Sequence, residues 1–203
     1  MITLYGITTS RAFRCLWLLE ELDKDYKHEP IDFRGKELQS EAYRSINPNS
    51  RVPTLVDDDL VLWESMAINL YLANKYGMKK GLWPEAVEQQ ALAYQWSFWV
   101  MTEVEHPLLT VLMHKRVLPE EKRDAQKVSR NAGVLRKPFE VLDQALENQA
   151  FLAGDHFTVA DLNVAAVLSW CKPARFSLKP YPNIDEWLNR CLQRPARKRA
   201  QVT

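Results

Sequence analysis

Residues 50–65 read SRVPTLVDDDLVLWES, and this stretch decides the fold of the N-terminal part of the chain. Apolar residues at Val52–Val56 and Leu60–Trp63 predict the two strands of a hairpin, joined by a turn of three aspartates. Proline cannot donate a hydrogen bond to a strand ladder, so Pro53 predicts a sheet edge or a deliberate irregularity. Such an irregularity leaves the N–H and C=O groups of Val52 free to pair with an extended, peptide-like ligand. A cis Val52-Pro53 bond with that role and a trans bond with a structural role fit the spacing equally well.

The same stretch ends on Glu64-Ser65, at the predicted start of a helix over residues 65–76. The first turn of a helix has unpaired N–H groups and a dipole that favours anions. The hydroxyl of Ser65 adds one donor, and Glu64 adds a negative charge beside it. The pair therefore suits a zwitterion, with its carboxylate at the helix start and its ammonium near Glu64. An ordinary serine cap is the simpler alternative.

Three consecutive hydroxyl side chains, those of Thr8, Thr9 and Ser10, precede another predicted helix. A thiol bound at this helix start would be acidified by the helix dipole and by a donated hydrogen bond. Capping by Ser10 or Thr9 is again the alternative reading.

The pattern around the hairpin predicts a small α/β domain. A strand at the N-terminus, a helix after Ser10 and a second strand over residues 26–33 imply a right-handed parallel crossover. A short helix over residues 36–46 and the helix over residues 65–76, closed by Gly77, complete the domain.

Only helical patterns follow the predicted linker at residues 78–84. The expected helices span residues 85–117, 120–148, 159–171 and 183–193, with interruptions at Pro107 and Pro138. Thr158 and Asp161 have the spacing of a capping box. We therefore predict a domain over residues 1–77 and an all-helical domain over residues 85–203.

Composition narrows the class of protein. The chain has 203 residues, a net charge of +1 and three widely spaced cysteines. This balance favours neither nucleic acid nor an acidic membrane as partner, and the cysteines suit reduced thiols in a cytoplasm. We expect no signal peptide, membrane span, nucleotide cofactor or metal. The aspartate turn is interpreted as polar, Cys15 as core, and the basic tail from Arg194 as a solvated helix end.

These motifs together resemble the cytosolic glutathione transferase family over nearly the whole chain. The resemblance rests on a set of short motifs in the family's order and spacing: Ser10-x-x-x-Arg14, Asn47-Pro48, Val52-Pro53-Thr54-Leu55, Glu64-Ser65-x-Ala67-Ile68, Phe157 to Leu162, and Arg194-Pro195. It implies an α/β thioredoxin-like N-terminal domain, an all-α C-terminal domain and glutathione as co-substrate.

The resemblance also assigns roles to residues of this chain. Val52, before a cis Pro53, would pair with the cysteinyl backbone of glutathione. Glu64 and Ser65 would hold its γ-glutamyl head. Three further assignments are Arg51 near the glycine carboxylate, Gln39 at a polar ligand-binding position, and Ser10 as the serine of the serine-type classes.

The second substrate is expected in the helical domain. Trp99, Thr102, Glu103 and His106 share one face of a predicted helix. In the family this helix lines the pocket for the electrophilic substrate, so Trp99, Thr102 and His106 are the predicted pocket residues. Packing in the core or between the domains is the alternative.

The predicted function is conjugation of the glutathione thiolate to a small electrophile, as in detoxification, by a cytoplasmic homodimer. The dimer is inferred because the helix over residues 65–76 is apolar nearly all round, so that beyond the face on the sheet it needs the second domain or a second subunit as partner. The resemblance favours both. Two alternatives stay open: a glutathione-dependent peroxidase or dehalogenase, and a non-catalytic carrier or partner-docking protein of the same fold.

Overall fold

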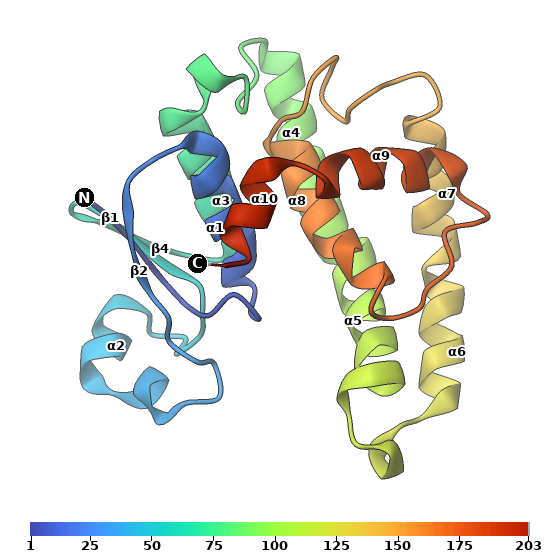
Figure 1. Ribbon diagram of the computed structural model, residues 1–203, viewed down its shortest axis with the longest axis horizontal. Helices are drawn as coiled ribbons and strands as arrows, with labels where there is room; N and C mark the ends of the chain where they lie inside the picture. Colours follow the sequence, from blue (N-terminus) through green and yellow to red (C-terminus); the bar gives the residue numbers. More distant parts are fainter. Residues whose placement is uncertain (203) are drawn as a thin grey trace. The chain divides into compact units, whose positions relative to one another are not determined.

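The computed structural model describes residues 1–202, which form two compact units. The first unit comprises residues 1–83 together with the segment from Gln193 on, and the second comprises residues 84–192. The sequence analysis assigned the terminal segment to the helical domain, whereas the structure packs it with the α/β unit (Figure 1).

A four-stranded sheet with strand order β2-β1-β3-β4 forms the centre of the first unit. The strands are β1 (Ile2–Tyr5), β2 (Tyr26–Glu29), β3 (Thr54–Asp57) and β4 (Leu60–Trp63). β1 runs parallel to β2 and antiparallel to β3, which confirms the predicted crossover and hairpin. β2 is shorter than predicted and ends before Pro30, because proline cannot extend the ladder.

Two helices, α1 (Ala12–Leu22) and α3 (Ser65–Tyr76), pack against each other beside the sheet. α3 has the bounds that the sequence predicts. The predicted helix over residues 36–46 is divided into a 3₁₀ turn, Lys36–Gln39, and α2 (Glu41–Ile46). Ser40 divides them because its backbone is extended and its hydroxyl caps α2.

The basic tail is not a solvated end, which corrects the sequence interpretation. Its helix α10 (Pro195–Ala200) lies against α1. The Arg194 guanidinium forms two hydrogen bonds, of 2.6 and 2.8 Å, to the Glu21 carboxylate of α1. Sequence periodicity gave no sign of this pairing because the partners lie at opposite ends of the chain.

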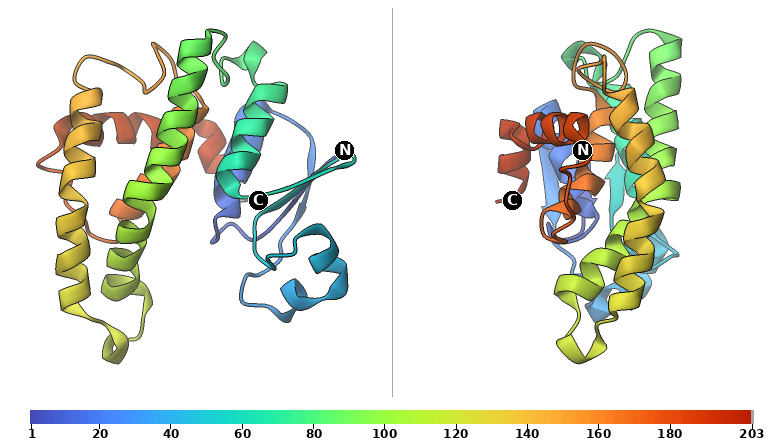
Figure 2. Two further views of the ribbon diagram at one scale, coloured as in Figure 1. Left: turned by 180° about the vertical axis from the view of Figure 1, so that it is seen from behind. Right: turned by 90° about the vertical axis from the view of Figure 1, so that its right-hand side faces the viewer.

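The second unit is entirely helical over the residues that the structure describes. Its α-helices are α4 (Val87–Trp99), α5 (His106–Leu112), α6 (Ala125–Val134), α7 (Arg136–Ala145), α8 (Val159–Leu168) and α9 (Pro182–Leu192). Figure 2 shows α4 and α5 in line, with α6 and α7 beside them, and α5 contacts α6. A π-helical segment, Val100–Glu105, interrupts the first pair, and another, Met113–Val117, follows α5. Pro107 lies in the first turn of α5.

Asp161 forms the predicted capping box and also organises the core of the second unit. Its carboxylate accepts hydrogen bonds from the N–H groups of Thr158 and Leu152 and from the indole of Trp187, at 2.9–3.0 Å. Burial raises its pKa, although these hydrogen bonds oppose that effect. The box therefore caps the start of α8 and also joins it to α9.

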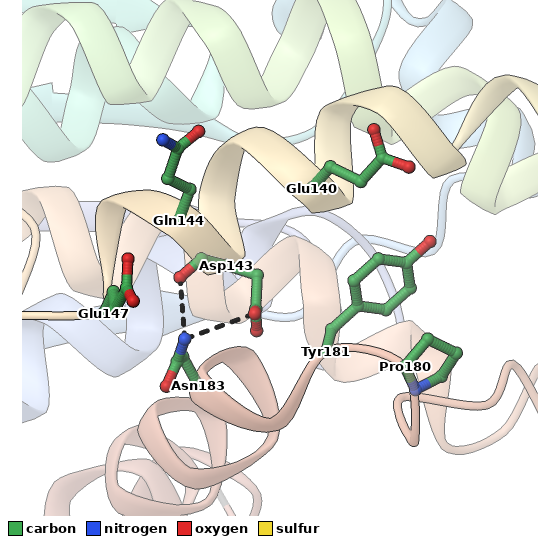
Figure 3. Close-up of a pocket in the computed structure, with 7 residues that line it drawn as sticks. All are labelled: Glu140, Asp143, Gln144, Glu147, Pro180, Tyr181 and Asn183. Carbon is green, nitrogen blue, oxygen red and sulfur yellow. Dashed lines mark hydrogen bonds between the residues drawn. The ribbon is translucent and has the colours of Figure 1, made fainter.

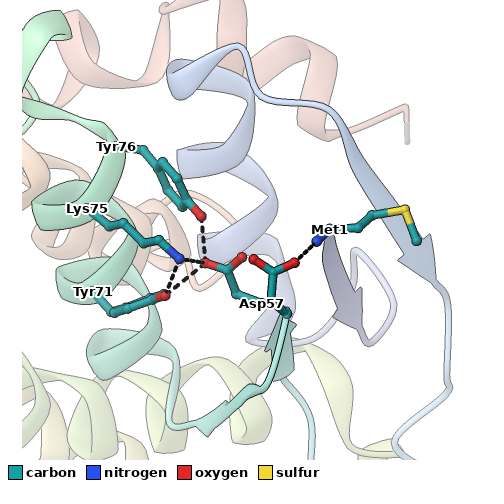
Figure 4. A network of polar contacts seen from close by, with 6 residues as sticks. Met1, Asp57, Tyr71, Lys75 and Tyr76 are labelled. Atoms are coloured by element: carbon teal, nitrogen blue, oxygen red, sulfur yellow. Dashed lines mark hydrogen bonds and ion pairs between the residues drawn. The ribbon is translucent and has the colours of Figure 1, made fainter.

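Asp57, at the end of β3, is the centre of a polar cluster that attaches the sheet to α3 (Figure 4). Its carboxylate accepts hydrogen bonds from Tyr71 at 2.8 Å, Lys75 at 2.9 Å and Tyr76 at 2.7 Å. Burial acts to raise the pKa of Asp57, but the three hydrogen bonds outweigh it and hold the pKa below its usual value. This aspartate is thus structural, whereas Asp58 and Asp59 are exposed in the turn.

We predict that Asp57→Asn lowers the free energy of unfolding at pH 7 by about 1.5–3 kcal/mol, the usual range for hydrogen bonds to a charged group. Asp59→Asn is the matched control and should change it by less than about 0.5 kcal/mol. Because the folded-state pKa is depressed, the stabilisation is present above the unfolded pKa of about 3.9 and disappears as pH falls through the folded value. Denaturant unfolding at pH 7 and pH 3 measures this. An equal loss at both pH values would contradict the assigned charge.

Candidate functional site

The entry to β3 presents backbone groups that the fold does not use. The Val52-Pro53 peptide bond is cis, with Pro53 buried and Val52 half-buried. No hydrogen bond among residues 1–202 engages the N–H or C=O of Val52. These groups are therefore available to an extended ligand.

Two side chains hold the residues on either side of this peptide bond, through the backbone of Arg51 and the side chain of Thr54. The Tyr43 hydroxyl donates to the Arg51 carbonyl at 2.7 Å and lies 2.8 Å from the Thr54 hydroxyl. The Asn47 amide donates to the same carbonyl at 2.8 Å and to the Thr54 hydroxyl at 3.0 Å. Burial raises the pKa of Tyr43, which keeps its hydroxyl protonated as a donor. Tyr43 of α2 and Asn47, which directly follows that helix, therefore fix the position of Val52.

The start of α3 forms a polar recess around Ser65, which is 4% exposed. The Arg14 guanidinium, buried in α1, donates a hydrogen bond of 3.2 Å to the Ser65 hydroxyl oxygen. Because Ser65 accepts this bond, its own proton remains available for a ligand. The N–H groups of the first helical turn add further donors, and the buried cation favours an anion here.

Glu64 lies directly before this recess in an unusual backbone conformation. Its φ is 73° and its ψ is 112°, and its side chain does not cap α3. Glu64 is exposed, so its carboxylate can meet a cationic group beside the helix start. Residues in such sparsely populated conformations gather at ligand sites because the surrounding structure holds them there.

The turn between β1 and α1 contains the predicted thiol-activating group. The Ser10 hydroxyl donates to the Ile7 carbonyl at 2.7 Å and accepts from the Ala12 N–H at 3.1 Å. A hydroxyl has one proton, so that of Ser10 is directed to the loop itself. Thr9 is exposed, and its hydroxyl makes no hydrogen bond within the described part of the chain.

The structure brings these segments together within the first unit. A Cβ added at Gly6 would lie 2.8 Å from the Cβ of Ala12 and 2.9 Å from that of Val52. The turn before α1 and the entry to β3 thus approach each other closely because Gly6 has no side chain. The Arg14 hydrogen bond joins the same helix to Ser65. Val52, Ser65 and the turn at Ser10 are therefore arranged around α1.

The two remaining predicted ligand residues of this unit are exposed. Gln39 ends the 3₁₀ turn before α2, and its side-chain oxygen accepts a hydrogen bond from Arg44. Arg51 directly precedes Val52. Its backbone carbonyl is held by Tyr43 and Asn47, while the residue itself is exposed.

The residues predicted to contact a second substrate all belong to the second unit, but they do not all line the same cavity. Thr102 and His106 line a cavity of about 670 Å³ between α5 and α6, together with Lys127 and Arg130. Trp99 does not line that cavity and packs edge-on against Trp96, with ring centroids 5.0 Å apart. The π-helical turn that follows Trp99 rotates the later residues away from the face that α-helical spacing predicts.

Another cavity of the second unit, of about 410 Å³, is acidic (Figure 3). Glu140 and Asp143 of α7 line it, together with Glu147 just beyond the end of that helix. The Asp143 carboxylate is engaged by the Asn183 amide at 3.2 Å and the Ile184 N–H at 3.0 Å. Asp143 therefore attaches α9 to α7. Within residues 1–202 no group of side chains has the arrangement of a metal site, and no helix is long and apolar enough to cross a membrane.

Sequence reasoning assigned no site role to Arg14, Tyr43 or Asn47. Arg14 had a detectable signal, because it is the one charged residue in the apolar run from Ala12 to Leu19. A charge in such a run needs a buried partner. Tyr43 had no comparable signal, since its partners depend on the path of the chain after α2.

Comparison with protein families agrees with this geometry. The model described as glutathione S-transferase, N-terminal domain, matches residues 1–74. The model described as glutathione S-transferase, C-terminal domain, matches residues 93–195.

Individual proteins match over nearly the whole chain. Glutathione S-transferase GstB of Escherichia coli strain K12 is 32% identical over 200 residues, which are 97% of this chain and 95% of that protein. The crystal structure of the theta class glutathione S-transferase from Xanthomonas axonopodis pv. citri, with glutathione bound, is 29% identical with a TM-score of 0.91. The alignment with this structure covers 100% of the present chain and 97% of the Xanthomonas chain. Ure2p in complex with glutathione is 27% identical with a TM-score of 0.86, covering 100% and 93% of the two chains.

We predict that Asn47→Ala lowers the free energy of unfolding by about 1–3 kcal/mol, because it leaves buried polar groups without their donor. Asn49→Ala is the control, because only the backbone N–H of Asn49 contacts Asn47, at 3.0 Å. Chemical denaturation of both variants measures the difference. If the two variants were equally stable, the amide of Asn47 would not be holding this segment.

Proposed function

Because the chain belongs to the glutathione S-transferase family, we propose that it conjugates the glutathione thiolate to a small electrophilic substrate. The observation that carries the proposal is the buried Arg14–Ser65 hydrogen bond at the start of α3, beside the unused backbone groups of Val52. Together they match a short extended peptide with an anionic end. Relatives of this chain bear the name glutathione S-transferase, and similar structures contain glutathione.

Each part of glutathione has a complementary group. The γ-glutamyl carboxylate binds the Ser65 hydroxyl and the first-turn N–H groups of α3, with Arg14 behind them. Its ammonium meets Glu64. The cysteinyl backbone pairs with Val52 as an added strand would. The glycine carboxylate lies near Arg51, with Gln39 as a further polar contact.

The thiol is activated by a donated hydrogen bond at the start of α1, as in the serine-type classes. Ser10 supplies it by turning its proton from the Ile7 carbonyl to the thiolate. A hydrogen bond to a charged group contributes about 1.5–3 kcal/mol, and the neutral bond given up is worth about 0.5–1.5 kcal/mol. The difference is on the order of 1–1.5 kcal/mol, or about one pKa unit at 1.36 kcal/mol per unit. The helix dipole adds about 0.3–1 kcal/mol.

The hydrogen bond from Ser10 to Ile7 is also the observation that favours a second candidate function. A hydroxyl that keeps its internal acceptor lowers no thiol pKa, and the protein would then bind glutathione without turning it over. Thr9 is the alternative donor, because its hydroxyl is exposed and uncommitted. Measuring the thiol pKa of the complex separates these cases.

We further propose a homodimer in the cytoplasm. The apolar character of α3 no longer argues for the dimer, because Met66, Ile68 and Leu70 are already buried within one chain. Exposed apolar side chains lie instead on β4, where Leu60, Val61 and Trp63 are 38–42% exposed. On α4, Val87 and Phe98 are 73% and 64% exposed. The three cysteines are buried and none of them forms a disulfide within residues 1–202, which suits a reducing compartment.

We predict that Ser65→Ala weakens glutathione binding about tenfold to a hundredfold, since it removes one charge-assisted hydrogen bond. Ser45→Ala, at an exposed position of α2, is the control and should leave the Kd unchanged. Calorimetric titration gives the Kd, and the Tm without ligand reports any lost capping. A lower Tm with an unchanged Kd would make Ser65 a cap only.

We predict that Ser10→Ala raises the pKa of bound glutathione by about one unit while the Kd changes less. The ultraviolet absorbance of the thiolate, followed against pH, gives the pKa in each complex. Thr9→Ala is titrated beside it as the rival donor. Turnover is then measured with a panel of electrophiles and a hydroperoxide. Overlapping titrations for both variants, with binding but no turnover in the parent, would establish the carrier function instead.

We predict a sedimentation mass of two chains at micromolar concentration. The double variant Val61→Lys, Trp63→Lys should shift it towards one chain, because like charges would oppose the pairing of exposed apolar surface. A parent mass of one chain would remove the dimer from the proposal.

A further inference from the structure

The short terminal helix α10 (Pro195–Ala200) contacts α1, the helix that begins at the thiol-activating turn (Figure 1). Six residues are too few to form a stable helix alone. Its position therefore depends on its contacts with α1. Ala196 and Ala200 are buried. Three arginines, Arg194 directly before the helix and Arg197 and Arg199 within it, reach side chains of α1.

Two of these arginines hold the last turn of α1. Arg194 forms the bidentate pair with Glu21, whose carboxylate also accepts the Trp17 indole N–H at 3.0 Å. Arg199 donates to the Glu20 carboxylate at 2.7 Å and to the Glu20 carbonyl at 2.8 Å. Bidentate pairs of this kind fix orientation as well as distance.

The third arginine reaches the first turn of α1. The Arg197 guanidinium lies 5.7 Å from the ring centroid of Phe13 and 5.9 Å from that of Trp17. Burial lowers the pKa of Arg197, although arginine stays charged at neutral pH. A planar cation held over two rings restricts how far the first of these residues can move.

Phe13 connects this contact to the site. Its backbone N–H donates to the Ser10 carbonyl at 3.2 Å. The path from the guanidinium to the hydroxyl-bearing residue thus contains one aromatic contact and one backbone hydrogen bond. A shift of Phe13 would change the direction in which Ser10 presents its hydroxyl.

We propose that Arg197 is a positioning residue for thiol activation, holding the first turn of α1 so that Ser10 can direct its hydroxyl at the thiolate. The proposal rests on the role given to this turn under the proposed function. Arg194 and Arg199 bind the last turn of α1. In this proposal α10 therefore influences the site through α1, without contacting glutathione.

The test compares Arg197→Met with Arg190→Met. Arg190, in α9 of the second unit, has contacts of the same kind: it pairs with Glu186, donates to the Ala150 carbonyl at 3.1 Å and lies 5.8 Å from the Phe151 ring centroid. Both variants should lower the Tm. Arg197→Met alone should raise the pKa of bound glutathione by about half a unit, which reduces the thiolate fraction about threefold below that pKa.

The affinity for glutathione should change less than twofold, because Val52 and Ser65 are not displaced. If Arg197→Met does not fold, Phe13→Leu removes the ring beneath the guanidinium and should shift the pKa in the same direction. An unchanged pKa with a lowered Tm would show that Arg197 only stabilises the fold. If Ser10→Ala and Thr9→Ala leave the pKa unchanged, the proposed activation itself fails, whatever Arg197→Met does.

Discussion

The buried Arg14 guanidinium imposes the constraint on which the site depends. A cation in an apolar helix must be paired, since an isolated buried charge costs far more than a folded domain can tolerate. Ser65 supplies a hydrogen-bond acceptor, and the Asn69 amide donates to the Arg14 carbonyl at 3.3 Å. These contacts attach the start of α3 to α1. The interaction that satisfies the fold also places a positive charge at the start of α3, the end of a helix that favours anions.

A second constraint concerns backbone groups that must stay unpaired. The chain around Val52 has no ladder partner to hold it, so Tyr43 and Asn47 hold the residues on either side instead. The sheet therefore has a rigid entry with two free hydrogen-bonding groups. Because this segment of the protein is already ordered, little of its conformational entropy is lost when a ligand pairs with these groups, which favours binding.

In the turn at Ser10 the hydroxyl is in place, but its proton is donated to the loop and not to a ligand. Its hydroxyl is satisfied within the loop, and activation of a thiol requires that proton to change acceptor. The energy difference between the two arrangements is small, so modest shifts of the first turn of α1 influence it. For this reason we propose that contacts from the distant end of the chain, through Arg197 and Phe13, influence thiol activation.

The sequence by itself determined the features that depend on near neighbours. The bounds of α3, the strand Leu60–Trp63 and the capping box at Asp161 follow from local periodicity, and the family motifs follow from order and spacing. Only the tertiary structure decided the pairing of Arg14 with Ser65, 51 residues apart, and of Arg194 with Glu21, 173 residues apart. It also decided the acceptor of the Ser10 proton and the rotation after Trp99. The physical reason is that a side-chain hydrogen bond depends on the path of the whole chain, which a local pattern does not contain.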